Sequence, residues 1–207
     1  VSGVCSGGSR LVVRKGVTVR DWSDLRGKVC AVARGSSQDI QFLLALKNKG
    51  ISVKDLDYKD LGGNLAVHIT ALQQGQADVA SMWEPFASQV LEQGIGTQFS
   101  TLYDESFRVN ALLLGHESYV EKNAASVQAV VDALVKSTDR LNSSPSDFLD
   151  AAMAISGFPR KTMEMSNSNV FLEYLLRADD ANKLASAVLE FGYVRNDIRP
   201  KFATALD

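Results

Sequence analysis

Short apolar runs alternate with helix-spaced apolar residues through the first half of this 207-residue chain. The apolar runs predict strands at 10–14, 29–33, 56–61, 77–82 and 99–102, after a loop at 5–9. Helical spacing predicts helices over 40–46, 65–74 and 84–93, closed by Gly50, Gly75 and Gly94. Strands that alternate with helices are typical of a parallel sheet covered by crossover helices, so we expect an α/β fold.

The second half of the chain is expected to be mostly helical. After one apolar run at 109–114, apolar stripes at helical spacing cover 127–141 and 181–189. Amphipathic helices need an apolar surface to cover, and this half supplies one strand candidate of its own. Three arrangements satisfy that need: a purely helical subdomain, helices docked on the first sheet, or a sheet built from residues upstream of Val1.

Composition narrows the class of protein. A chain with 45% apolar and 22% charged residues is ordinary for a globular protein, which excludes a disordered tail or a collagen-like protein. The net charge of −2 gives no electrostatic reason to expect nucleic acid or an anionic membrane surface as the main partner. No stretch approaches the ~18 apolar residues that a membrane span needs. At ~150 residues per domain, the length allows one large domain or two small lobes.

The cysteines and the first residue add two expectations. Cys5 and Cys30 are too few for a disulfide scaffold and match no zinc spacing, so no metal site is expected, and whether the two pair is left open. The chain opens at Val1 without an initiator methionine or a signal peptide. This indicates either processing or a start within a longer protein.

The sharpest local feature is the sequence VARGSS at 32–37, between a predicted buried strand and a helix. A helix start exposes unpaired N–H groups and the positive end of the helix dipole, which stabilise an anion. Gly35 allows close approach of the backbone, and the Ser36 and Ser37 hydroxyls can bind an oxyanion or cap the helix. A plain N-cap is the alternative. The Gly-Lys-Ser/Thr of a phosphate loop is absent.

A second strand-to-helix junction carries the sequence SMWEPF at 81–86. Trp83 can form an apolar wall over a small ligand, and Glu84 can accept hydrogen bonds from it. The alternative is a core tryptophan followed by an acid in the first helical turn. Because open α/β folds bind ligands at the carboxyl ends of their strands, two such junctions favour a shared crevice.

The sequence offers no catalytic constellation, so we expect no enzyme and no cofactor. His68 and His116 lie in no HExxH arrangement and accompany no nucleophile elbow. Cys30 lies in a predicted buried strand, where a thiol packs inertly, and Cys5 has no His or Cys close in sequence. Lys and Arg are dispersed along the chain, which indicates a solvated surface.

Several motifs together carry a family resemblance. They are SGGSRLVVRK at 6–15, the Trp22-x-x-Leu25-x-Gly27-Lys28 pattern, VARGSS at 32–37, GQADVA at 75–80, WEPF at 83–86, VEKN at 120–123 and FGYV at 191–194. In this order and spacing the chain resembles the periplasmic substrate-binding proteins of the sulfonate, taurine and nitrate ABC importers. The likeness runs over essentially the whole chain.

The resemblance implies an α/β, two-lobed fold of the periplasmic-binding-protein type II, which closes on a small solute without chemistry. Residues 1–17 would form a strand of lobe one and a hinge crossing, 18–105 lobe two, and 106–207 the return to lobe one. Family members begin with roughly a further half-domain, so we expect the N-terminal part of lobe one to be missing from this chain. Packing of the 127–141 and 181–189 helices on a sheet made wholly from residues 1–207 would count against this.

The resemblance also implies the ligand site. The loop at 6–9 would face the cleft from one lobe, and the two strand-to-helix junctions would face it from the other, with the run around 110 as a hinge crossing. The implied ligand-binding residues are Gly7, Gly8, Ser9, Gly35, Ser36, Ser37, Trp83, Glu84 and Asn110.

The implied function is that of a solute-binding component of an ABC importer. Such a protein clamps a small anionic or oxyanion-bearing solute, such as an alkanesulfonate, as a periplasmic monomer or an anchored extracellular lipoprotein. Its macromolecular partner would be a permease in the membrane, with no nucleic acid involved. The choice among sulfonate, taurine, nitrate and pyrimidine stays open. The alternatives are a sensory domain, or an enzyme of the same fold in thiamine pyrimidine synthesis, whose Cys-rich motif is absent here.

Overall fold

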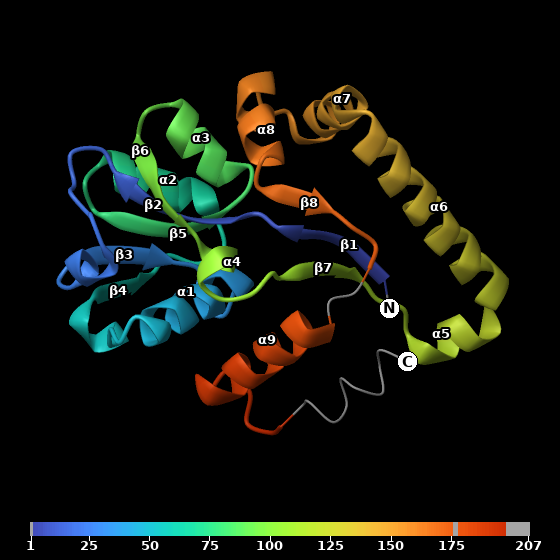
Figure 1. Ribbon diagram of the computed structural model, residues 1–207, viewed down its shortest axis with the longest axis horizontal. Helices are drawn as coiled ribbons and strands as arrows, with labels where there is room; N and C mark the ends of the chain where they lie inside the picture. The colour runs from blue at the N-terminus through green and yellow to red at the C-terminus, as the bar shows by residue number, and fades with distance from the viewer. Residues whose placement is uncertain (1, 176–177, 198–207) are drawn as a thin grey trace.

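Two β-sheets organise the chain in the computed structural model, which describes residues 2–175 and 178–197 (Figure 1). The five-stranded sheet has the order β4-β3-β5-β2-β6, and the three-stranded sheet has the order β7-β1-β8. The strands are β1 (Ser2–Gly7), β2 (Ser9–Arg14), β3 (Val29–Val32), β4 (Asp57–Asp60), β5 (Val79–Trp83), β6 (Gly96–Thr101), β7 (Asn110–Leu113) and β8 (Val170–Leu172). The predicted α/β class is confirmed.

The helices cover both sheets. They are α1 (Ser37–Asn48), α2 (Leu65–Gln73), α3 (Phe86–Glu92), α4 (Leu102–Glu105), α5 (Glu117–Lys122), α6 (Ala124–Ser143), α7 (Pro145–Ser156), α8 (Arg160–Asn167) and α9 (Ala178–Glu190), with short 3-10 turns η1 (Trp22–Leu25) and η2 (Val53–Asp55). Within the described ranges no helix is both long and apolar enough to cross a membrane.

The five-stranded sheet is mixed. Strand β3 runs parallel to β4 and β5, as the strand–helix alternation predicts, but β2 pairs antiparallel with both β5 and β6. The expected parallel arrangement therefore holds for β3, β4 and β5 and is wrong for the pairing of β2 with β5 and β6. Strand β2 enters from the three-stranded sheet without a preceding crossover helix, so the handedness rule for parallel units does not fix its direction.

Two apolar clusters fill the faces of the five-stranded sheet. On the α1 face, Phe42 and Leu46 are buried against Leu11 and Val79, with Trp22 packed at the edge. The opposite face buries an equivalent cluster from the sheet and from α2 and α3: Val12, Ala31, Leu65, Ile69, Leu72, Ala80, Met82, Ala87 and Val90. Each Å² of apolar surface that is buried stabilises the fold by about 25 cal/mol. Because apolar side chains are buried on both faces, this sheet forms the core of the molecule.

The three-stranded sheet joins three segments that are far apart in sequence. Strand β1 is central and antiparallel to both neighbours; its Ser6 lies opposite Asn110 of β7 and Phe171 of β8. The expected loop at 5–9 is therefore wrong except at Gly8, because residues 5–7 complete β1 and Ser9 begins β2. The glycine- and serine-rich segment has weak strand propensity, and the pairing on both sides overrides it.

Helix α6 runs along the three-stranded sheet with its apolar stripe only half covered (Figure 1). Val130 is 54% exposed, and Val127, Val131, Leu134 and Val135 are half-buried. The stripe borders a groove of about 570 Å³ that also includes Leu114 and Tyr119. The expectation of further chain over this stripe stays a prediction.

Helix α9 packs on α1, a helix of the five-stranded sheet. Ala187 is buried against Ile40 of α1 and against Phe107, and Leu184 and Val188 pack at the edge of this cluster. The domain boundaries expected at 17/18 and 105/106 stay predictions. The structure leaves Cys5 and Cys30 as free thiols, one in each sheet.

Candidate functional site

The chain crosses from one sheet to the other at two glycines. Gly7 and Gly8 have φ angles of +80° and +76°, a left-handed conformation that favours glycine. The Gly8 N–H donates to the Asn169 carbonyl at 2.7 Å, and the Gly8 carbonyl accepts from the Glu84 N–H at 2.9 Å. The crossover is therefore fastened both to the end of β5 and to the residue before β8.

The first strand-to-helix junction is closed by an N-cap. Ser36 Oγ accepts the Asp39 N–H at 3.2 Å, and Gly35 N–H donates to Asp39 Oδ2 at 2.8 Å. The N-cap alternative from the sequence therefore describes Ser36. The N–H groups of Ser37 and Gln38 lie in the first turn of α1, where an α-helix has no intrahelical acceptor for them.

Asp39 places a buried carboxylate at this helix start. It is 0% exposed and accepts hydrogen bonds from the hydroxyls of Tyr58 and Tyr193, the latter at 2.5 Å. Burial and the neighbouring Asp39 raise the pKa of both phenols, that of Tyr193 to about 12. The Tyr193 ring also lies beside Gly35, 3.6 Å from where a Cβ would stand. Tyr193, which follows α9 by three residues, thus covers part of the junction.

We expect the titration of Tyr193 to report this contact. Its folded pKa of about 12 exceeds the ordinary value of 10.0, so the stability it contributes is present below pH 10 and is lost as the pH rises through 12. The difference in phenolate absorbance between the parent protein and Tyr193→Phe isolates this transition. In Asp39→Asn the transition should move to lower pH; an unchanged midpoint would contradict the assignment to Asp39.

The two junctions lie against each other. Ser81 Oγ donates to the Gln38 carbonyl at 3.2 Å, which joins β5 to the first turn of α1. Two residues further along β5, Trp83 pairs with Ser9 across the sheet. The N-terminal turn of α1, the end of β5 and the crossover therefore form one continuous region.

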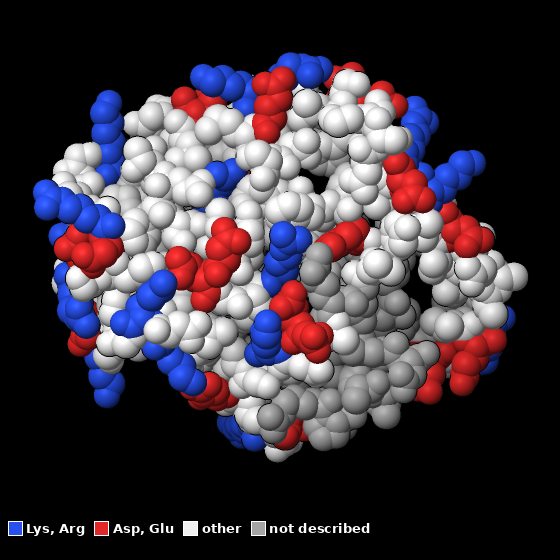
Figure 2. All heavy atoms as spheres, viewed as in Figure 1, with Lys and Arg blue, Asp and Glu red and all other residues white. Residues whose placement is uncertain are grey.

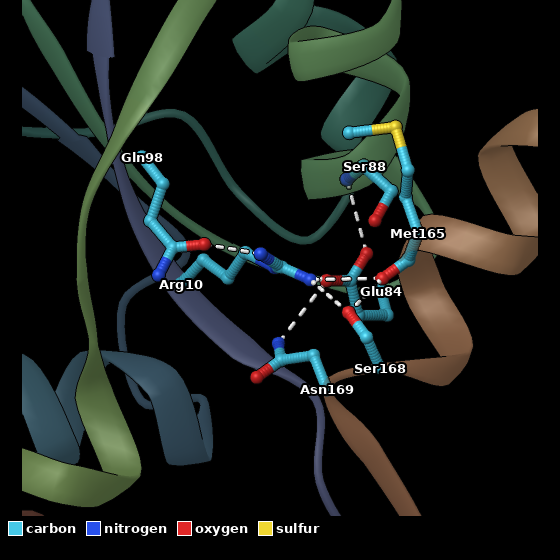
Figure 3. A network of polar contacts seen from close by, with 7 residues as sticks. All are labelled: Arg10, Glu84, Ser88, Gln98, Met165, Ser168 and Asn169. Atoms are coloured by element: carbon cyan, nitrogen blue, oxygen red, sulfur yellow. Dashed lines mark hydrogen bonds and ion pairs between the residues drawn. The ribbon is translucent and has the colours of Figure 1, made fainter.

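Glu84 forms a buried ion pair with Arg10 (Figure 3). The two side chains are 2% and 9% exposed, respectively. Glu84 Oε1 accepts from Arg10 Nε and from Asn169 Nδ2 at 3.1 Å, and Oε2 accepts from the Ser88 N–H at 3.0 Å. Contact of Glu84 with a solute stays a prediction, because both of its oxygens meet protein donors here.

Arg10 connects the five-stranded sheet to the end of α8. Its guanidinium donates to Gln98 Oε1 on β6, to the Met165 carbonyl at 3.0 Å and to Ser168 Oγ at 3.5 Å (Figure 3). Arg10 is 7% exposed, so the expectation of a solvated surface is wrong for this arginine. A carboxylate and a carbonyl replace the water that a surface arginine would bind. Elsewhere Lys and Arg are interspersed with Asp and Glu over the face in Figure 2.

Polar atoms without a protein partner gather around the crossover. Among the described residues, Ser6 Oγ, Ser9 Oγ, Asn110 Nδ2 and Asn169 Oδ1 are buried and make no hydrogen bond. In Figure 3 the Asn169 amide oxygen points away from the Arg10–Glu84 pair. Leaving such a group buried and unpaired costs about 1–3 kcal/mol. Several of them in one region indicate a place that accepts solvent or a polar solute.

The predicted site residues thus fall into two adjoining groups. Gly7, Gly8, Ser9, Trp83 and Glu84 lie at the crossover and the β5 end. A second group at the α1 start, Gly35, Ser36 and Ser37, adjoins it through the Ser81–Gln38 bond. Asn110 joins the crossover from β7, opposite Ser6.

Sequence reasoning missed several residues in this region: Arg10, Asp39, Tyr103, Arg108, Asn169, Phe171 and Tyr193. Each of them has a partner far away in the sequence, such as Glu84 for Arg10 and for Asn169, and Asp39 for Tyr193. Local patterns do not mark such contacts. Within residues 2–175 and 178–197, no three His, Cys, Asp or Glu side chains are grouped to hold a metal ion.

Comparison with known proteins identifies the family to which the chain belongs. The NMT1/THI5 like family matches residues 6–147, more than half of the chain. The chain belongs to this NMT1/THI5-like family. Over 133 residues it is 29% identical to a protein of Escherichia coli (strain K12) named as an inferred aliphatic sulfonates-binding protein. That match covers 61% of this NMT1/THI5-like chain and 41% of the relative, so the chain spans about two fifths of the relative's length.

Solved structures share the fold of this NMT1/THI5-like chain. The periplasmic aliphatic sulphonate binding protein SsuA from Escherichia coli matches with a TM-score of 0.77 and 21% identity, over 96% of this chain and 70% of that one. The desulfurization enzyme DSZB matches with a TM-score of 0.72 and 14% identity, over 97% of this chain and 75% of that one. The predicted periplasmic-binding-protein fold is confirmed, and the same fold occurs in an enzyme.

Proposed function

We propose that the protein is a solute-binding component of an ABC importer that holds a small anionic or oxyanion-bearing solute such as an alkanesulfonate. The observation that carries the proposal is the group of buried, unpartnered polar atoms where the chain crosses between the sheets. A bound solute would supply the partners that the protein does not. The sulfonate-binding name of the curated relative supports the same class of ligand.

The donors at the crossover suit an oxyanion. The hydroxyls of Ser6 and Ser9 and the amide of Asn110 can each donate a hydrogen bond. The N–H groups of Ser37 and Gln38 in the first turn of α1 lie nearby. Each hydrogen bond to a charged group contributes about 1.5–3 kcal/mol, and micromolar affinity needs about 8 kcal/mol. A handful of such contacts is therefore enough. The proposed site residues are Gly7, Gly8, Ser9, Gly35, Ser36, Ser37, Trp83, Glu84 and Asn110.

The proposal extends to location and partners. Several of the structurally similar proteins are named as periplasmic or as ABC-transporter components, which supports a periplasmic protein that delivers its solute to a membrane permease. A monomeric state is part of the proposal. Closing of two lobes on the solute would present the loaded form to that permease.

Calorimetric titration tests the proposal directly. Alkanesulfonates, taurine, nitrate and a pyrimidine are titrated into the protein, and binding to at least one of these solutes is expected with micromolar affinity. Thermal unfolding with and without each solute is the independent readout, because a ligand that binds only the folded state raises the melting temperature. No heat and no thermal shift with any of these solutes would contradict the proposal.

An enzyme of the same fold is the second candidate, since the desulfurization enzyme DSZB shares the architecture. Prolonged incubation of the protein with each solute that binds, followed by mass spectrometry, separates the two candidates. A binding protein returns the solute unchanged. Release of a product in amounts exceeding the protein would favour the enzyme.

A further inference from the structure

One face of the three-stranded sheet carries a row of side chains suited to a charged solute. Ser6 of β1 lies opposite Asn110 of β7 and opposite Phe171 of β8, so the three side chains stand on the same face. Asn110 Nδ2 and Ser6 Oγ are both unpartnered. The row therefore offers two hydrogen-bond donors next to an aromatic ring.

Arg108 lies over this row. Its guanidinium carbon is 3.9 Å from the centre of the Phe171 ring, which places it beside the row, and 5.7 Å from the centre of the Tyr103 ring. The two rings meet edge to face at 5.8 Å. The two rings support the guanidinium and cover one of its faces, and its N–H groups donate to none of the described residues.

Arg108 forms no ion pair with an acidic side chain in the part of the chain that the structure describes. No ion pair or hydrogen bond joins its guanidinium to the acidic side chains of the described residues, in contrast to Arg10 and Arg14. Asp180 of α9 lines the small cavity beside Arg108 and Asn110, and its carboxylate is 3.5 Å from the Lys183 amine. A half-buried cation with free donors next to unpartnered amide and hydroxyl groups is an arrangement that binds an anion.

Gly7 leaves the space that the Phe171 ring occupies beneath Arg108. A Cβ at this position would lie 2.9 Å from the Phe171 ring, so a side chain there would displace the ring that holds Arg108. The glycine expected from the sequence to face a ligand therefore has a second consequence: it allows Phe171 to lie beneath the guanidinium.

We propose that Arg108, seated on Phe171 and Tyr103, binds the acidic head group of the solute together with Asn110 and Ser6. This inference rests on the proposed function and names the part of the site that recognises the negative charge. A planar guanidinium donates two parallel hydrogen bonds to two oxygens of a sulfonate, and the Asn110 amide is placed for the third.

The test compares a charged solute with its neutral analogue. Butanesulfonate and butanesulfonamide are titrated by calorimetry into the parent protein, Arg108→Gln, Arg108→Lys and the control Arg160→Gln. Arg160 is a half-exposed arginine of α8 paired with Asp150, far in sequence from the row. We expect Arg108→Gln to weaken butanesulfonate binding about 10–100-fold and to leave butanesulfonamide binding unchanged. The affinity of Arg108→Lys for butanesulfonate should lie between those of the parent and Arg108→Gln, and the affinity of Arg160→Gln should equal that of the parent.

The outcomes separate this inference from the proposed function. If the parent binds butanesulfonate and Arg108→Gln binds it equally well, the role of Arg108 is overturned and the solute-binding function stands. If the parent binds neither this solute nor the others named above, the proposed function fails first. Equal loss of sulfonate and sulfonamide binding in both Arg108 variants would also overturn the inference, because it would indicate a structural role.

Discussion

Replacing Glu84 by glutamine is expected to lower the free energy of unfolding by about 3–5 kcal/mol. The near-isosteric change removes the charge and leaves the Arg10 guanidinium buried without its carboxylate; the two side chains are 2% and 9% exposed. The loss is large compared with the ~5–15 kcal/mol that stabilises a typical domain. Urea denaturation followed by circular dichroism measures it.

An exposed ion pair provides the matched control for Glu84. Asp57 and Lys59 are 51% and 49% exposed, so Asp57→Asn should change the unfolding free energy by less than about 1 kcal/mol. The double variant Arg10→Met/Glu84→Leu should recover much of the loss, since it leaves neither charge buried alone. A loss for Glu84→Gln as small as that for Asp57→Asn would contradict the buried network.

Replacing Gly7 by alanine is expected to destabilise the protein by about 2–5 kcal/mol. Two effects combine at this position. The φ angle of +80° is strained for any residue with a Cβ, and the new Cβ would stand 2.7 Å from the Asn169 carbonyl oxygen and 2.9 Å from the Phe171 ring. Because the crossover is fastened on both sides, backbone as well as side chains must shift.

Gly16 separates the two effects. Its φ angle is +85°, but a Cβ there would meet nothing within 4 Å. Gly16→Ala should therefore cost only the backbone strain, about 1–2 kcal/mol. Chemical denaturation of both variants checks the difference, and equal losses would show that the close contact at Gly7 is unimportant.

The elements of the five-stranded sheet were largely predictable. The run 29–33 is apolar and β-branched, and β3 forms at Val29–Val32. Helix α1 begins after the Ser36 N-cap and ends before Gly50, whose φ of +67° stops the helix. These signals act within one or two turns of the chain, so the sequence carries them without tertiary information.

The three-stranded sheet was not predictable in the same way. Residues 5–7 are poor in β-branched side chains and indicate a loop, yet β1 is central, with neighbours that start at 110 and 170. Strand β8 is only Val170–Leu172 and gives no periodic pattern. Pairing between distant segments, rather than local propensity, creates this sheet.

The sequence by itself determined the α/β class, the two strand-to-helix junctions and the family resemblance, because capping, hydrophobic periodicity and motif spacing are local properties. Only the tertiary structure decided which side chains meet. Arg10 finds Glu84 74 residues away and Met165 155 residues away, and Arg108 rests on a ring from β8. Such contacts depend on how the sheets pack, and in a chain of this length many pairings are compatible with the same local pattern.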